Sequence, residues 1–258
     1  MHSWKHYKKL RQKKYRDEWN LFIVEGTRFC REALQSNWTI EAAFINDNFL
    51  YHPSHQIFND FFHRKQIVPQ SLADKEFKKL SMIKNPQGIL LVMQIPERYF
   101  DVKINKTEMN VVLLLESIRD PGNLGTIIRT ADWFGIKLII ASSDCAEFFN
   151  PKCLRASMGS IFRVMCVEVD ELNSWIQKLK KDKFFLVGTS PHTGQQLFNL
   201  KVRYPLAICL GGEAKGISDN IQKSVDITAY IPKYGEGESL NVAVSAGILM
   251  NYFKNLLK

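Results

Sequence analysis

The chain has 258 residues, of which 45% are hydrophobic and 24% are charged. These proportions are ordinary for a globular protein, so they exclude a wholly disordered chain, a collagen and a coiled-coil rod. No run approaches the ~20 apolar residues of a membrane span. The basic N-terminus is not followed by an apolar stretch, so we expect neither a secretory leader nor a membrane partner.

The cysteines and histidines point away from disulfides and metals. Five cysteines are an odd number, none forms a CxxC pair, and most stand in apolar runs. This usage is typical of reduced thiols in the core of a cytoplasmic protein. The six histidines lack cysteine or paired-carboxylate companions, so the sequence predicts no metal site.

Positive charge is concentrated near the N-terminus. The formal net charge is +9, and residues 1–16 contain seven bases and no acid. Bases interleaved with Trp4, Tyr7 and Tyr15 suit phosphate contact together with base stacking, whereas a solvated basic helix face is the alternative. The residues predicted to contact nucleic acid are Lys8, Lys9, Arg11, Lys13, Lys14 and Arg16 here, and Arg119 and Arg155 farther along the chain.

The first 96 residues alternate apolar runs with helical patterns. Ser71 is the expected cap of a helix that ends near residue 82, with Asp74 in the acidic position of a capping box. A polar linker is expected at residues 97–109. The other elements predicted before it are strands at 21–24, 40–45 and 87–95, and helices at 27–35 and 53–65.

The second part, residues 110–258, has a clearer pattern. Short, near-continuous apolar runs are separated by helical patterns, which predicts an α/β domain with a parallel sheet covered on both faces. A long helix is expected from Ser239, as its N-cap, to Leu257. The predicted strands are 111–116, 137–141, 164–169, 184–188 and 207–210.

Three loops of unusual composition follow strands of this part, where parallel sheets bind ligands. The first, residues 117–131, contains an Asp-Pro-Gly-Asn turn. Asn123 stands where it could cap the next helix. Arg129 follows six residues later, so a helix N-terminus and a guanidinium could form an anion site. A tight turn with a surface arginine is the alternative.

The other two loops contain three glycines each. Residues 210–218 contain three glycines that allow close approach to the backbone, but their spacing is neither GxGxxG nor a Walker A loop. Residues 231–247 form an acidic, glycine-rich loop that runs into a helix of small residues. An ordinary capped helix is the alternative for this third loop.

Together the three loops resemble the motifs of the SpoU/TrmH family of SPOUT-class RNA methyltransferases. Residues 123–131 match its N-x-G-x-x-x-R-T-A pattern, and residues 211–218 match G-x-E-x-x-G-[LI]-S. Residues 231–247 match I-P-M-x-G-x-x-x-S-L-N-V-x-V-A-x-G, with Lys233 for the usual Met and Ser245 for the usual Ala.

The resemblance covers nearly the whole chain. Residues 155–160 are similar to the family's R-A-S-x-G-S segment, and FIVEGTRFCREAL and NPQGILLV look like its separate RNA-substrate-binding domain. It implies a small L30e-like α/β domain over residues 1–96 and a SPOUT methyltransferase domain over residues 110–258. The family's methyltransferase domain has a C-terminal trefoil knot and works as a homodimer.

The resemblance also implies a cofactor, S-adenosylmethionine. The second and third loops would bind it, largely through backbone atoms, and Arg129 would come from the partner subunit. The implied cofactor-binding residues are Leu210, Gly211, Gly212, Gly216, Ile231, Pro232, Ser239, Leu240 and Asn241.

The reaction of the family is methyl transfer to a ribose 2′-hydroxyl of structured RNA. A guanidinium does not give up its proton, so we interpret Arg129 as a fixed cation on the target phosphate and the developing oxyanion. Phosphate, water or Glu213 would take the proton. Glu213 could instead bond loop amides, and Asn241 could cap a helix. The matching polar set is Asn123, Arg129, Glu213, Ser239 and Asn241.

The RNA target is chosen by analogy alone. Family members with the extra N-terminal domain often act on ribosomal RNA, which favours rRNA over tRNA. Two other functions stay open: a non-catalytic RNA-binding or ribosome-assembly factor, and methylation of a base, as in other SPOUT branches. The intact polar set argues against a disused site.

Overall fold

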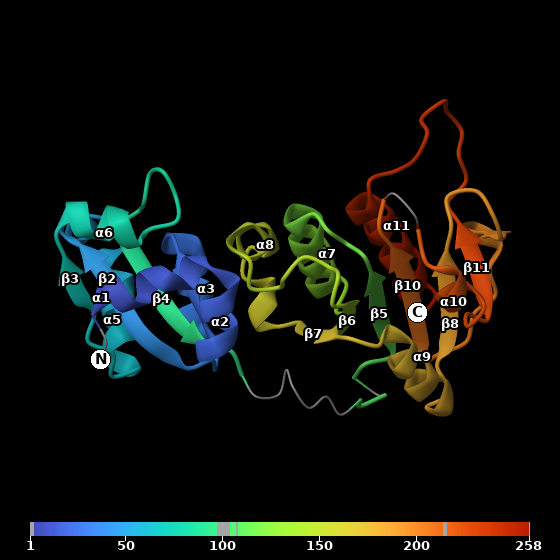
Figure 1. Cartoon of the computed structure of the whole chain (residues 1–258), viewed down its shortest axis with the longest axis horizontal. Helices are drawn as coiled ribbons and strands as arrows, with labels where there is room; N and C mark the ends of the chain where they lie inside the picture. The colour runs from blue at the N-terminus through green and yellow to red at the C-terminus, as the bar shows by residue number, and fades with distance from the viewer. Residues whose placement is uncertain (1–2, 97–103, 107, 214–215, 258) are drawn as a thin grey trace.

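A computed structural model describes residues 3–96, 104–106, 108–213 and 216–257. Residues 97–103 and 107 of the predicted linker lie outside the described part. The chain builds two sheets, which lie side by side along the long axis of the molecule (Figure 1). No helix in the described ranges is long and apolar enough to cross a membrane.

The first sheet has four strands in the order β1-β4-β2-β3. Strand β4 pairs antiparallel with β1 and β2, and β2 pairs parallel with β3. Its elements are α1 (Trp4–Tyr7), η1 (Lys8–Arg11), α2 (Lys13–Trp19), β1 (Leu21–Glu25), α3 (Thr27–Gln35), β2 (Ile40–Asn46), α4 (Asp47–Leu50), α5 (His55–Arg64), β3 (Gln70–Leu72), α6 (Asp74–Leu80) and β4 (Ile89–Gln94).

Helices cover both faces of this sheet, which is why its strands read as continuous apolar runs. Alternate residues of a strand point to opposite faces. Phe22 packs with Cys30 of α3 and Phe58 of α5 on one face. Ile23 packs with Tyr7 of α1 on the other, where α6 also lies. The two helical layers therefore separate the surface of α3 and α5 from that of α1 and α6.

The second sheet has seven strands in the order β7-β6-β5-β10-β8-β11-β9, and every pairing between its described strands is parallel. Its elements are β5 (Val111–Glu116), α7 (Pro121–Trp133), β6 (Leu138–Ser142), α8 (Pro151–Ser157), η3 (Ser160–Phe162), β7 (Met165–Val169), α9 (Leu172–Lys181), β8 (Phe185–Thr189), β9 (Gln195–Gln196), η4 (Leu197–Asn199), β10 (Leu206–Gly211), α10 (Asp219–Gln222), β11 (Ile227–Tyr230) and α11 (Val242–Asn255).

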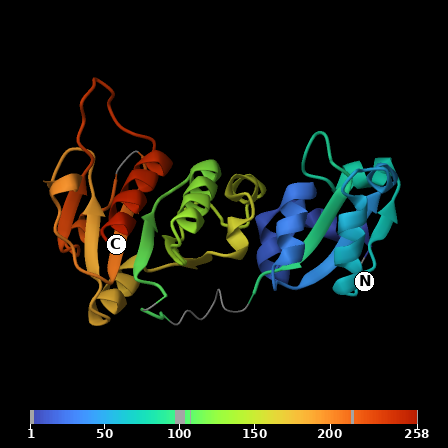
Figure 2. The ribbon, with the colours of Figure 1, turned by 180° about the vertical axis from the view of Figure 1, so that it is seen from behind.

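Helices α7, α8 and α11 cover one face of this sheet, and α9 and α10 cover the other (Figure 2). The predicted α/β class with a parallel sheet is confirmed. The five predicted strands are present with bounds shifted by at most one residue, whereas β9 and β11 were not predicted. These two are short and only partly buried, so they lack an apolar run.

Aromatic side chains join the two sheets into one core. Phe22 and Phe149 lie 4.8 Å apart between ring centroids, and Trp38 and Phe162 lie 5.2 Å apart. Phe29 of α3 also contacts Phe162, at 5.5 Å. Because these rings are buried and belong to segments on both sides of the linker, hydrophobic burial fixes the two units against each other.

Ion pairs surround this aromatic contact. The Arg16 guanidinium contacts both carboxylate oxygens of Glu147, at 2.7 and 2.5 Å, and also donates to the Leu10 carbonyl at 2.6 Å. Its side chain is only 4% exposed. Lys13 lies 3.8 Å from Glu168, but both of these side chains are well exposed.

The N-terminal segment therefore differs from the expectation of an RNA-contacting arm. Trp4 and Tyr7 are buried against the sheet, so their rings pack in the core and are not accessible for stacking on bases. Arg16 is buried in its ion pair, and Arg11 donates to the carbonyls of Lys79 and Ser81. The remaining predicted contacts of this segment are exposed: Lys8, Lys9, Lys13 and Lys14.

The predicted cap at Ser71 is wrong. Ser71 lies inside β3 and pairs with Ile45 of β2. Helix α6 begins three residues later, at Asp74, and Ala73 occupies its N-cap position without a side-chain bond. The carboxylate of Asp74 accepts bonds from Asn46 and Asn48. Ser71 is not available as a cap because residues 70–72 pair with β2.

Replacing Arg16 by alanine should lower the free energy of unfolding by about 3–5 kcal/mol, because it leaves the carboxylate of Glu147, whose side chain is only 11% exposed, without its partner. Lys13→Ala is the matched control on the same helix, and its exposed pair should contribute no more than about 1 kcal/mol. Urea denaturation followed by circular dichroism measures both. Equal losses in the two variants would contradict the assignment of Arg16 to the core.

Candidate active site

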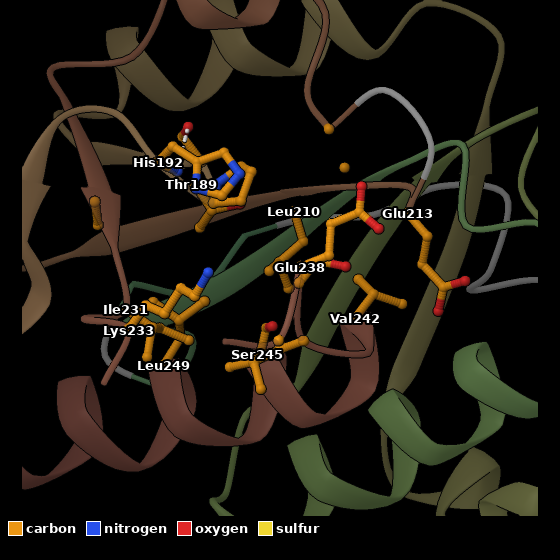
Figure 3. A pocket seen from close by; sticks show the side chains of 18 of the residues that line it. Thr189, His192, Leu210, Glu213, Ile231, Lys233, Glu238, Val242, Ser245 and Leu249 are labelled. Atoms are coloured by element: carbon orange, nitrogen blue, oxygen red, sulfur yellow. Dashed lines mark hydrogen bonds between the residues drawn. The ribbon is translucent and has the colours of Figure 1, made fainter. Parts of the chain in front are cut away.

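A pocket of about 340 Å³ lies beyond the carboxyl ends of β8, β10 and β11, beside the start of α11. Figure 3 shows side chains from these elements converging on it. Leu210 and Val242 contribute apolar wall, and Glu213 and Glu238 lie near its edge. Of the predicted cofactor-binding residues, those that line the pocket are Leu210, Gly211, Gly212, Gly216, Ile231, Pro232, Ser239 and Leu240.

Glycine is required at the pocket wall formed by the second loop. A Cβ on Gly212 would lie 2.3 Å from the backbone oxygen of Ser117, far inside van der Waals contact. Gly212 also pairs with Gly216, whose amide donates to the Gly212 carbonyl at 2.9 Å. Gly216 has φ +62, a conformation that favours glycine. The loop can therefore present its backbone to a ligand.

Three predicted polar residues meet at one point. The Asn123 side-chain amide donates to Glu213 Oε1 at 2.8 Å, and the Asn241 amide donates to the same oxygen at 3.0 Å. Asn241 also lies within hydrogen-bond distance of Asn123 Oδ1, at 3.0 Å. Asn123 and Asn241 are not themselves in the pocket wall, so they reach it through Glu213, which is.

Helix capping puts these residues in place. Asn241 Oδ1 accepts the amides of Ala243 and Val244, so Asn241, and not Ser239, is the N-cap of α11. Asp120, and not Asn123, is the N-cap of α7, and it accepts the Asn123 amide at 2.9 Å. The capping side chain of Asp120 leaves that of Asn123 free to bond Glu213.

The acid that caps α7 is held in its charged form. Lys152 of α8 lies 2.6 Å from Asp120. This hydrogen bond, together with that from the Asn123 amide, lowers the pKa of the Asp120 carboxyl below its usual value. The cap therefore stays ionised at neutral pH, and a negative charge at a helix N-terminus is stabilising.

Arg129 lies apart from the pocket of its own chain. It is exposed on α7, does not belong to the pocket wall and makes no hydrogen bond or ion pair with any described residue. Ser239 lines the pocket but makes no side-chain hydrogen bond within the described ranges. The structure thus gathers Asn123, Glu213 and Asn241, and separates Arg129 from them.

The two predicted RNA contacts of the second part lie on the surface. The Arg119 side chain is 78% exposed and lies 3.7 Å from Asp144. Arg155 is exposed on α8. Both guanidinium groups are therefore accessible to a polyanion.

One wall of the pocket was not predicted from the sequence. Thr189 ends β8, Ser190 and His192 follow it, and all three line the pocket. In Figure 3, Thr189 and His192 lie on the side opposite α11. Thr189 donates its hydroxyl to the Cys209 carbonyl of β10 at 2.9 Å. The rule that ligands bind beyond the carboxyl ends of parallel strands applies to the predicted strand 184–188 as well, so it could have found this segment.

Comparisons with known proteins agree with this geometry. Residues 110–251 match the SpoU rRNA Methylase family, and residues 3–91 match the MRM3-like substrate binding domain. The chain belongs to the SpoU rRNA methylase family. The match spans the sheet and all three loops of the pocket.

Full-length relatives place both units of the chain in the same family. The 23S rRNA (guanosine(2553)-2'-O)-methyltransferase RlmP of Bacillus subtilis is 32% identical over 250 residues, which are 97% of this chain and 95% of that protein. The structure of an AdoMet-bound rRNA methyltransferase from Sinorhizobium meliloti superposes with TM-score 0.84 at 26% identity and covers 99% of this chain and 95% of that chain. A putative RNA methyltransferase of the TrmH family from Porphyromonas gingivalis gives TM-score 0.81 at 27% identity, with 99% of each chain covered.

The two cap assignments for α11 can be separated by stability. Asn241→Ala removes the bonds to two helix amides, so it should lower the free energy of unfolding by about 1 kcal/mol or somewhat more. Ser239→Ala removes no side-chain hydrogen bond to the described residues and should change the free energy of unfolding by less than about 0.5 kcal/mol. Urea denaturation of both variants is the measurement, and a larger loss in Ser239→Ala would restore Ser239 as the cap.

Proposed function

We propose that this chain transfers a methyl group from S-adenosylmethionine to a ribose 2′-hydroxyl of ribosomal RNA in the cytoplasm. The observation that carries the proposal is the pocket itself: the three family motifs form its wall and the hydrogen-bonded cluster at its edge. The full-length similarity to RlmP supports rRNA as the substrate class.

The pocket fits the cofactor on its own geometry. Its volume of about 340 Å³ falls within the range of small-molecule sites. Leu210, Ile231 and Leu249 give it apolar walls, and the close packing of Gly212 on Ser117 leaves room that a side chain would take. We assign the adenosyl group to this pocket, with contacts to the backbone of the second and third loops.

S-adenosylmethionine supplies an electrophilic methyl group on a sulfonium. In the transfer the S–CH₃ bond breaks, an O–CH₃ bond forms, and the ribose hydroxyl loses its proton. We assign Arg129 to the substrate, where its fixed charge would hold the target phosphate and stabilise the oxyanion that develops. Phosphate or water would then take the proton.

Glu213 is better suited to positioning than to proton transfer. Its Oε1 already accepts two amide bonds, from Asn123 and Asn241. A carboxylate oxygen so engaged holds the starts of α7 and α11 together beside the pocket. Asn123, Glu213 and Asn241 are thus positioning residues in this proposal, and Ser239 remains a candidate cofactor contact.

A homodimer and the trefoil knot of the family are part of the proposal. Arg129 is exposed and lies outside its own pocket, as expected for a residue that serves the site of a partner subunit. Exposed apolar side chains on α7 and α11 support a buried contact there: Trp133 is 84% exposed and Val244 is 52% exposed. We place the RNA-binding unit at residues 1–96 and the methyltransferase domain at residues 110–258.

The activity can be tested with unmodified bacterial 23S rRNA made by transcription in vitro. The purified chain and methyl-tritiated S-adenosylmethionine should put label into a 2′-O-methylated nucleoside, identified after nuclease digestion by mass spectrometry. Label in a methylated base would contradict ribose transfer, and absence of label would leave a non-catalytic RNA-binding protein. Arg129→Ala should lower kcat by about 10²–10³-fold and leave cofactor affinity unchanged.

The cofactor assignment predicts the effect of one methyl group. Gly212→Ala should weaken S-adenosylmethionine binding at least tenfold, because the new Cβ meets the Ser117 backbone and must displace the loop. Gly247→Ala is the matched control, since Gly247 is not in the pocket wall and a Cβ there makes only an ordinary contact, 3.7 Å from Thr130 Cγ2. Isothermal titration calorimetry measures both affinities, and thermal melting checks that each variant is folded. Equal affinity of the two variants would contradict the assignment of the cofactor to this pocket.

A further inference from the structure

A second cavity, of about 300 Å³, lies on the first sheet's helical layer between α3 and α5. It belongs to neither the pocket nor the predicted basic segment. Its lining residues are Thr27, Arg28, Arg31, Glu32, Ser54, Ile57 and Phe58.

The cavity carries net positive charge. Arg28 and Arg31 are exposed and make no hydrogen bond or ion pair with any described residue. Their i, i+3 spacing puts both guanidinium groups on one face of α3. The carboxylate in the wall, Glu32, is already paired with Arg163, at 2.5 Å. Two guanidinium groups without a partner at one cavity suit phosphate oxygens, which they can bind through paired N–H donors.

This cavity is tied to the helix that carries the active-site residues. Arg163 contacts Glu32 of α3 and also Asp132 of α7, at 2.8 Å. Asp132 follows Asn123 by nine residues, which is about 14 Å along the axis of α7. Arg129 lies one turn before Asp132. Arg163 therefore links the wall of the cavity to the end of α7, the helix that also carries Arg129 and Asn123.

The other basic surface of this unit is differently placed. Residues of α1 and η1 pack on the opposite face of the first sheet, with α6. The Arg16 side chain is held in its ion pair with Glu147, and the Arg11 side chain donates to two backbone carbonyls. The exposed lysines of this surface line neither of the two cavities described above, and within the described residues they make no ion pair with α7.

We propose that the cavity between α3 and α5 binds the phosphate backbone of the RNA substrate beside the target nucleotide. The inference rests on the proposed function, since it takes the substrate to be RNA. The Glu32–Arg163–Asp132 bridge then keeps the bound phosphates in register with Arg129, so that docking at the cavity selects which ribose reaches the methyl group.

Filter binding of the full chain to the unmodified 23S rRNA transcript, from about 50 to about 200 mM salt, tests this inference. The double variant Arg28→Ala with Arg31→Ala should bind about tenfold more weakly, and its slope of log affinity against log salt should fall by about 1.5. Lysine at both positions should restore most of the salt slope. The KM for RNA should rise with little change in kcat, and cofactor affinity should not change.

Lys75→Ala with Lys79→Ala is the matched control, because it removes two exposed positive charges from α6 on the opposite face. It should bind RNA within about twofold of the parent. The inference is overturned if both double variants behave alike, or if only replacement of Lys8, Lys9 and Lys14 weakens binding. Because binding is measured apart from methylation, an inactive parent chain whose affinity still depends on Arg28 and Arg31 would count against the proposed reaction but not against the cavity.

Discussion

Glu213 lies where the starts of two long helices meet, and the candidate site depends on that contact. Its Oε1 accepts one amide from Asn123 of α7 and one from Asn241, the cap of α11. The N-terminus of a helix carries partial positive charge, so a carboxylate is stabilised between two of them. The glycine loop that bears Glu213 is thereby fixed to both helices, and the pocket wall is fixed with it.

The second constraint is the aromatic contact between the sheets. Phe22, Trp38, Phe149 and Phe162 are buried together, so the first unit is not a freely tethered appendage. Ion pairs at the edge of this contact, such as Arg163 with Glu32, restrict rotation further. A surface on α3 consequently keeps its distance from α7, which an RNA substrate that spans both units can exploit.

The motifs predicted which segments form the pocket because each follows a strand of a parallel sheet, and such strands end at the same edge. The caps were predicted less well. Asn123 and Ser239 are good caps by composition, but Asp120 caps α7 and Asn241 caps α11. A capping role for Asn241 was one of the two roles that the sequence left open, and the structure confirms it. Ser71 pairs with Ile45 of β2 as part of a strand and therefore does not cap α6.

The sequence by itself determined the fold class, the family and the loops that build the pocket, because periodicity and the spacing of motif residues are local properties of the chain. Only the tertiary structure decided which charged and aromatic side chains are buried and which stay exposed. Tyr7 and Arg16 entered the core while Arg28 and Arg31 stayed free, although all four stand in short, locally polar stretches. Burial depends on what packs against a residue from elsewhere in the chain: Glu147, the partner of Arg16, lies 131 residues away.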